Sequence, residues 1–120
     1  MSIKYRGALT EPMFYVLMAF NQGELCGTEI THMVQFRTNG RVSLGPGTLY
    51  TLLGKFVEEK LIEETEVQGR KRTYRITDKG REVYREEVNR LRTCLSDAMD
   101  AERGILPNGA YTGIPAPAIP

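Results

Sequence analysis

The segment GPGTLYTLLGKF, residues 45–56, predicts a helix that is buried along one side. Its apolar residues recur at the spacing i, i+3, i+4 and i+7, which puts them on one face: Leu49, Leu52, Leu53 and Phe56. Pro46 suits the first helical position, because its missing N–H is one that a helix cannot pair. The other face carries the polar residues Thr48, Thr51 and Lys55. We therefore expect a helix that packs on a core and keeps a polar face.

Two shorter helices are predicted before this segment. The first begins after Thr10, a suitable N-cap, and has Pro12 in its first turn. Its inward residues follow at helical spacing: Met13, Val16, Leu17 and Phe20. It ends at Asn-Gln-Gly, residues 21–23, and a second helix extends from residue 26 or 27 to about residue 37. Both helices are expected to contribute to the core.

After residue 60 the pattern changes to strands. Residues 61–67 and 72–76 are rich in β-branched or aromatic side chains, and Gln-Gly-Arg-Lys separates them. This arrangement predicts a β-hairpin with a basic tip. Residues 77–78, Thr-Asp, then cap a helix that extends to residue 102 or 103, where Gly104 and Pro107 end it.

The long helix predicts self-association. At about 1.5 Å per residue it is roughly 39 Å long, which exceeds what a body of this size can cover. Its apolar residues fall at alternating steps of four and three, with Met99 beside the last: Tyr84, Val88, Leu91, Leu95 and Ala98. One interpretation is a homodimer whose interface is formed by Met13, Leu17, Tyr84, Val88, Leu91, Leu95 and Met99. The alternative is that the stripe packs only on the protein's own first helix.

Composition excludes several classes of protein. With 120 residues, 41% of them apolar and 26% charged, the chain is expected to form about one globular domain. Its two cysteines, Cys26 and Cys94, lack the spacing of a metal site or a disulfide scaffold, and both are expected to be small buried residues. The one histidine, His32, leaves little material for metal chemistry, and no metal or cofactor is predicted. The N-terminus lacks the apolar run of a signal peptide and no segment could span a bilayer, so a cytoplasmic protein without a membrane partner is expected.

Charge is distributed unevenly, although the net charge is only +1. Six basic residues face the single acid Asp78 between residues 70 and 81: Arg70, Lys71, Arg72, Arg75, Lys79 and Arg81. Such a run is often only a solvated face. Here it follows three helices, and the order of elements describes a mainly α fold with a small β-hairpin: a winged helix-turn-helix domain and a long C-terminal dimerisation helix. In that fold the third helix enters the major groove of DNA and the hairpin neutralises phosphates.

The expected domains follow from this order. Residues 1–77 form the winged-helix DNA-binding domain, residues 78–103 form the dimerisation helix, and residues 104–120 form a Pro-, Gly- and Ala-rich flexible tail.

Two motifs at their mutual spacing resemble the PadR family of bacterial transcriptional regulators. They are Gly-Thr-Leu-Tyr at residues 47–50 and Arg-Thr-Tyr-Arg-Ile-Thr-Asp-Lys-Gly-Arg at residues 72–81. The resemblance covers roughly residues 8–92 and fits the short branch of the family. It implies a homodimeric winged-helix repressor of double-stranded DNA operators, whose affinity a small-molecule effector can lower.

By position, the resemblance implies DNA contacts from the third helix and from the hairpin tip. These residues are Thr48, Tyr50, Thr51, Lys55, Arg70, Lys71 and Arg72. Two alternatives stay open at this point. Tyr50 contacts DNA or belongs to the core with its hydroxyl at the surface. Thr48 caps the helix, contacts phosphate, or does both.

The sequence departs from the family pattern at two positions. Lys60 stands where many relatives have glycine after the third helix, so a left-handed turn is less comfortable there. Gly54 stands where relatives often have a longer side chain, and glycine inside a helix costs about 1 kcal/mol relative to alanine. Either a neighbour packs closely on Gly54 or the position is merely tolerated.

Some short members of the family bind flat aromatic drugs between subunits by means of a tryptophan, and this chain has no tryptophan. A corresponding cavity would be lined by residues that otherwise form dimer core: Met13, Tyr15, Met18, Val88, Leu95 and Met99.

Two other function classes compete with a DNA-binding repressor. A winged helix can also serve as a protein–protein interaction module that does not bind DNA, because fold alone does not fix function. The basic hairpin tip argues against that interpretation, since such a module does not need it. An enzyme is disfavoured, because no nucleophile–base spacing, phosphate loop or ligand cluster is present.

Overall fold

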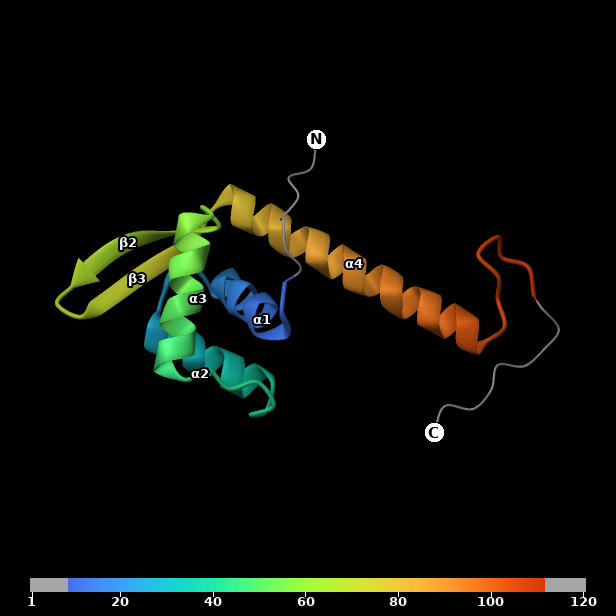
Figure 1. Ribbon diagram of the computed structural model, residues 1–120, viewed down its shortest axis with the longest axis horizontal. Coiled ribbons are helices and arrows are strands. Elements are labelled where there is room, and N and C mark those ends of the chain that lie inside the picture. Colours follow the sequence, from blue (N-terminus) through green and yellow to red (C-terminus); the bar gives the residue numbers. More distant parts are fainter. Residues whose placement is uncertain (1–8, 112–120) are drawn as a thin grey trace. The chain divides into compact units, whose positions relative to one another are not determined.

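The computed structural model describes residues 9–111, and Figure 1 shows the course of the chain. Its elements are α1 (Glu11–Ala19), the 3₁₀ helix η1 (Phe20–Gln22), β1 (Leu25–Cys26), α2 (Gly27–Arg37), α3 (Pro46–Glu58), β2 (Ile62–Gln68), β3 (Lys71–Ile76) and α4 (Asp78–Glu102). The predicted fold class, a mainly α winged helix with a small hairpin and a long final helix, is confirmed. Strand β1 was not predicted.

The chain forms two compact units, of which the first ends at Glu87 and the second begins at Val88. Residues 78–87 of α4 therefore belong to the first unit. The domain boundaries expected from sequence, after residues 77 and 103, stay a prediction. Among the described residues, no helix is both long enough and apolar enough to cross a membrane.

Two sequence predictions fall wholly or partly on residues that are not described. The expected lack of a signal peptide concerns residues 1–8, and the end of the predicted tail concerns residues 112–120; both lie outside the described residues. The start of the tail is described and has local order. The backbone N–H of Leu106 donates to the carbonyl of Ala110 at 2.7 Å, and Ile105 forms a β-bridge with Tyr111.

The core of the first unit lies between its helices and the sheet. Its fully buried side chains are Val16, Leu17, Ile30, Leu53, Phe56, Leu61 and Ile62. All four apolar residues predicted on the inner face of α3 are buried. Each large apolar side chain that is buried contributes about 1.5–3 kcal/mol, so α3 is held mainly by this face.

Met13 and Leu17, which the sequence placed both on the inward face of the first helix and at a dimer interface, are buried in this core. Leu17 has no exposed surface and Met13 is only 7% exposed. The physical reason is that the inward stripe of α1 packs against α2 and the rest of the core, which leaves these side chains little or no surface for contact with a second copy. The other five predicted interface residues lie on α4.

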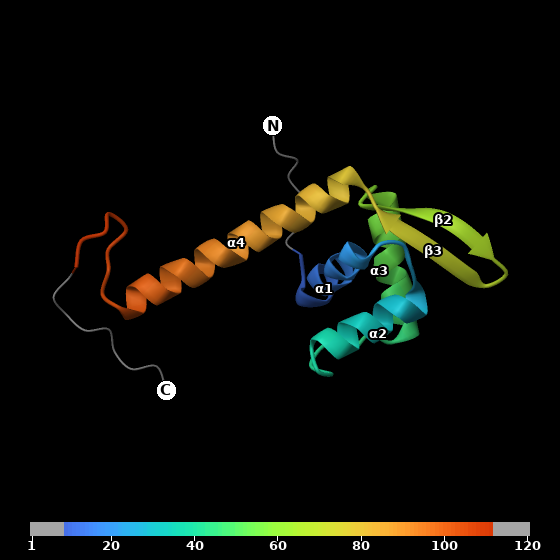
Figure 2. The same cartoon turned by 180° about the vertical axis from the view of Figure 1, so that it is seen from behind.

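The three strands form one antiparallel sheet in the order β1-β3-β2. Leu25 of β1 pairs with Tyr74, and Ile62 of β2 pairs with Ile76. The register shifts between Glu64 and Glu66, so Thr65 is the extra residue of a β-bulge. Figures 1 and 2 show the β2–β3 hairpin extending beyond the helices from its base beside α3.

The predicted helix starts are present. Thr10 caps α1, because its Oγ1 accepts a hydrogen bond from the backbone N–H of Met13 at 3.3 Å. Pro46 occupies the first turn of α3. Thr77 precedes α4, and its Oγ1 accepts from the backbone N–H of Gly80 at 3.0 Å.

Thr77 also ties the start of α4 to the loop after α3. Its backbone N–H donates to the carbonyl of Leu61 at 3.0 Å, and its hydroxyl donates to the carbonyl of Lys60 at 2.6 Å. Gly80 makes the close approach possible, since a Cβ at this position would lie 2.1 Å from the Leu61 carbonyl oxygen. This contact gives a physical reason for the threonine and the glycine of the second motif.

The two departures from the family pattern have different outcomes. Lys60 adopts φ 63°, the left-handed conformation that glycine takes more easily. Gly54 is exposed, and a Cβ placed on it would meet no atom within 4 Å. Of the two alternatives for Gly54, the described residues therefore fit a tolerated position.

We predict that Gly80→Ala destabilises the protein by about 3 kcal/mol or more, because the added methyl group collides with backbone rather than with a flexible side chain. Urea unfolding followed by circular dichroism measures the change. Gly54→Ala serves as the matched control and is expected to stabilise α3 by up to about 1 kcal/mol. Equal stability of the Gly80→Ala protein and the unmodified protein would contradict the close approach.

We predict that Lys60→Gly raises the free energy of unfolding by about 1 kcal/mol, because it relieves the left-handed backbone strain at a lysine. Lys60→Ala removes the same charge but keeps a Cβ, so it should give no such gain. Thermal and urea unfolding of the three proteins provide the measurement. A gain of similar size in both variants would attribute the effect to the side chain and not to φ.

Candidate nucleic-acid interface

The exposed face of α3 is polar, as predicted. Thr48, Thr51 and Lys55 are all exposed, and no acidic residue lies in the first turn of the helix. The positive end of the helix dipole is therefore not neutralised by a carboxylate of that turn. An open groove of about 650 Å³ follows this face and is lined by Thr10, Pro12, Met13, Gly47, Thr48, Thr51, Leu52 and Lys55.

The sequence left two alternatives open for Tyr50, contact with DNA or a place in the core, and the structure places it at the surface. Its side chain is 49% exposed, so it is not a core residue. Its hydroxyl lies 2.9 Å from the point where a Cβ on Gly27 would be, so the ring leans on the first turn of α2. A larger residue at position 27 would push the ring away. Tyr50 is thus held at the surface by α2, with half of its side chain open to solvent.

The hairpin tip carries the predicted basic residues. Gly69 adopts φ 60° in the turn, and Arg70, Lys71 and Arg72 are exposed. The guanidinium of Arg72 forms an ion pair with Glu64 of β2, with 3.0 Å between Nη1 and Oε2. This pairing across the hairpin was not predicted from the sequence.

The rest of the basic run has partners within the fold. Arg75 pairs with Glu63, and Arg81 pairs with Asp78. The Nζ of Lys79 donates to the carbonyl of Glu59 at 3.0 Å. The run predicted as one basic stretch therefore divides into a hairpin tip and a set of residues that bind their own chain.

The structure brings the predicted DNA contacts together within the first unit, on α3 and on the hairpin beside it (Figure 1). Their role in binding DNA stays a prediction. Of the predicted dimer residues on α4, Tyr84 stacks on Phe14 of α1 with ring centroids 5.4 Å apart. The alternative of packing on the first helix thus applies to Tyr84. In the second unit, Leu91, Leu95 and Met99 are 40%, 62% and 43% exposed.

Sequence reasoning missed the contribution of α2 to this surface. An apolar pocket of about 330 Å³ lies between α2 and the start of α3, lined by Thr28, Thr31, His32, Leu44, Pro46, Leu49 and Tyr50. Gly27 is the sequence feature that could have indicated this contact, because the start of a helix does not otherwise require a residue without a Cβ. A contact between side chains of two helices cannot be read from their separate periodicities.

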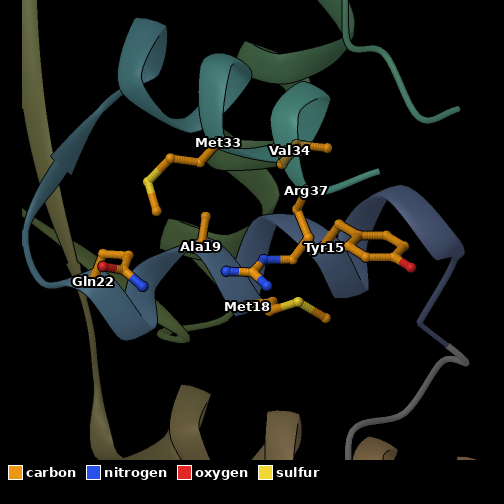
Figure 3. Close-up of a pocket in the computed structure, with 7 residues that line it drawn as sticks. All are labelled: Tyr15, Met18, Ala19, Gln22, Met33, Val34 and Arg37. Atoms are coloured by element: carbon orange, nitrogen blue, oxygen red, sulfur yellow. The ribbon is translucent and has the colours of Figure 1, made fainter. Parts of the chain in front are cut away.

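A second, smaller pocket lies between α1 and α2 (Figure 3). It is lined by Tyr15, Met18, Ala19, Gln22, Met33, Val34 and Arg37, and its volume is about 10 Å³. That volume holds about one water molecule and no organic ligand. Across residues 9–111, no group of three or more His, Cys, Asp or Glu side chains is placed to hold a metal ion.

Comparison with known proteins supports the same fold. A family model described as the transcriptional regulator PadR-like family matches residues 16–86 of the chain. No curated protein sequence matches the chain significantly.

Solved structures that are similar to this chain include the following three. A transcriptional regulator from Clostridium thermocellum has a TM-score of 0.65 and 20% identity over 74% of this chain and 87% of its own. Bordetella bronchiseptica BpsR, solved to explain how 6-hydroxynicotinic acid regulates its DNA binding, has a TM-score of 0.62 and 18% identity over 88% of this chain and 74% of its own. Bacillus subtilis PadR in complex with operator DNA has a TM-score of 0.56 and 25% identity over 63% of this chain and 46% of its own.

Glu29 in the first turn of α2 provides a test of local structure. Its Oε1 accepts a hydrogen bond from the backbone N–H of Cys26 at 3.0 Å, and this bond is the main cause of a lowered pKa for the Glu29 carboxyl. The side chain of Cys26 lowers the pKa further, and the nearby charge of Lys71 adds a smaller effect. A carboxylate with a lowered pKa stabilises the folded state above its ordinary pKa, and that contribution disappears as pH falls through the lowered value.

We predict that Glu29→Ala destabilises the protein by about 0.5–1 kcal/mol near neutral pH, a modest value because the carboxylate is exposed. The difference from the unmodified protein should shrink when unfolding is repeated in acid, below about pH 4. Urea unfolding at both pH values measures it. A difference that grows in acid would contradict the hydrogen bond as its cause.

Proposed function

The chain belongs to the PadR-like family of transcriptional regulators, and from this we propose that it is a repressor that binds an inverted-repeat DNA operator as a homodimer. The observation that carries the proposal is the exposed polar face of α3 beside a hairpin with a basic tip. The family is one of DNA-binding regulators rather than enzymes.

The geometry of α3 supports contact with the major groove. Its buried leucines hold one side of the helix to the core, so Thr48, Thr51 and Lys55 remain exposed on the other. A helix that presents polar residues near its N-terminus reads base edges, while its N-terminus favours phosphate. The complex of Bacillus subtilis PadR with operator DNA supports a DNA partner for the present chain.

The hairpin supports contact with the phosphate backbone. Arg70 and Lys71 lie at the turn between β2 and β3, where the hairpin extends beyond the helices (Figure 2). Basic side chains in such a position release counterions from DNA, which adds affinity that depends on salt and is indifferent to sequence. Base preference would then come from α3.

The second unit supports a homodimer. Leu91, Leu95 and Met99 repeat at steps of four along α4, and each is at least 40% exposed. A helix with an exposed apolar stripe of this kind pairs readily with a copy of itself. Two copies related by a two-fold axis would present two α3 helices to half-sites about 10 bp apart.

We also propose a small hydrophobic effector that relieves repression. The relative BpsR, whose DNA binding 6-hydroxynicotinic acid regulates, supports a small-molecule effector of this kind of regulator. The pocket between α1 and α2 does not supply it, because that pocket has room for about one water molecule.

The function is tested by selection of bound fragments from genomic DNA, followed by sequencing and by measurement of the oligomeric state at micromolar concentration. A dimer that recovers an inverted repeat supports the proposal. A monomer that is not retained on DNA even at low salt would overturn it and leave the protein-interaction module as the better interpretation.

We predict that Lys55→Ala and the double variant Arg70→Ala/Lys71→Ala each weaken binding to the selected fragment about three- to tenfold, and that each lost phosphate contact reduces the salt slope by about 0.9. Thr51→Ala should instead change which bases are selected. Fluorescence anisotropy over a series of salt concentrations measures affinity and slope. Arg92→Ala, which removes one positive charge from the second unit as Lys55→Ala does from the first, is the control, and a loss equal to that of Lys55→Ala would contradict the assigned contacts.

A further inference from the structure

One ion pair lies on the hairpin that we propose to contact phosphates. The guanidinium Nη1 of Arg72 is 3.0 Å from the carboxylate Oε2 of Glu64, and the two side chains are 57% and 32% exposed. The pair is therefore formed in contact with solvent, in the same element as the basic tip. A carboxylate here competes with phosphate for the same donor group.

Strand register shows which face of the hairpin carries the pair. Glu64 lies opposite Tyr74, and Arg72 is two residues from Tyr74 along β3, so all three share one face of the sheet. Tyr74 and Ile76 on this face are buried, so this is the side of the sheet that faces the helices. Because β2 contacts α3, Arg72 lies on the side of the hairpin where α3 lies.

The β-bulge at Thr65 isolates Glu64 on this face. Without the extra residue, Glu64 and Glu66 would alternate onto the same side of β2. With it, Glu66 lies opposite Thr73, on the other face, and Val67 lies opposite Arg72. Glu64 is therefore the acid of β2 that remains beside Arg72.

The opposite face holds a matched ion pair. Glu63 lies directly opposite Arg75, and the Nε of Arg75 is 2.5 Å from Oε1 of Glu63. The two pairs have the same chemistry and their acids are neighbours in the chain. They differ in the face of the sheet that they occupy.

We propose that Glu64 limits the affinity of the protein for DNA, because it holds Arg72 in an ion pair that a phosphate has to displace. This inference rests on the proposed function. An exposed ion pair is weak, so DNA can open it.

An opposite role for Glu64 is distinguishable. A carboxylate that orients the guanidinium of Arg72 toward DNA would increase affinity, as positioning residues do. Removal of its charge would then weaken binding. The sign of the change therefore decides between a competitor for Arg72 and a residue that orients it.

The test uses the full chain and the fragment selected from genomic DNA, with four variants: Glu64→Gln, Glu63→Gln, Arg72→Gln and the double variant Glu64→Gln/Arg72→Gln. We expect Glu64→Gln to tighten binding about three- to tenfold and to steepen the salt slope by up to about 0.9, the value for one phosphate contact. Glu63→Gln, which makes the same charge change on the other face, should alter affinity by less than about twofold. In the Arg72→Gln background, Glu64→Gln should also have less than about a twofold effect.

Three outcomes would overturn the inference while the proposed function stands: weaker binding by Glu64→Gln, equal tightening by Glu63→Gln, or full tightening in the Arg72→Gln background. If the unmodified protein binds no DNA at low salt, the proposed function fails and the inference falls with it. Circular dichroism and thermal unfolding establish that each variant is folded. Glutamine keeps the size of glutamate, and the side chain of Arg72 is exposed, so the hairpin should tolerate all four changes.

Discussion

The contact between Thr77 and the chain at Lys60 and Leu61 is the constraint on which the arrangement of the first unit depends. It joins the end of α3, the start of β2, the end of β3 and the start of α4, because Thr77 donates hydrogen bonds to the carbonyls of Lys60 and Leu61 and accepts one from the backbone N–H of Gly80. Because Gly80 has no side chain, α4 comes close enough to the Leu61 carbonyl for these bonds to form. The same bonds tie together the two ends of the hairpin, because Leu61 precedes β2 and Thr77 follows β3.

That constraint explains how a small core can present two separate surfaces, the exposed face of α3 and the hairpin tip, to one partner. The exposed face of α3 is held by its buried leucines, whereas the hairpin tip has no core of its own. The position of the tip therefore depends on the base of the hairpin, where Ile62 and Ile76 pair and are buried. Packing at the base of the hairpin positions Arg70 and Lys71, as the buried leucine face of α3 positions Thr48 and Lys55.

Much of this fold could be predicted from the sequence because local signals agree with tertiary packing. The spacing of Leu49, Leu53 and Phe56, the cap at Thr10 and the change of pattern after residue 60 each indicated the element that is present. Strand β1 could not be predicted, because two residues carry no periodicity. The pairs of Arg72 and Arg75 with β2 depend on the strand register, which shifts between Glu64 and Glu66. Interactions between elements were therefore the part that the sequence did not reveal.

The acidic residues of β2 also disfavour pairing of this edge strand with an extended segment of another molecule. β2 lies at the edge of the sheet, so its outer backbone N–H and C=O groups are a template on which another extended segment could add. Glu63, Glu64 and Glu66 place like charges along that edge, and the bulge at Thr65 interrupts its regular hydrogen-bonding pattern. Two copies aligned edge to edge would repel each other there, so the exposed hairpin is protected from aggregation by the residues that also pair with its arginines.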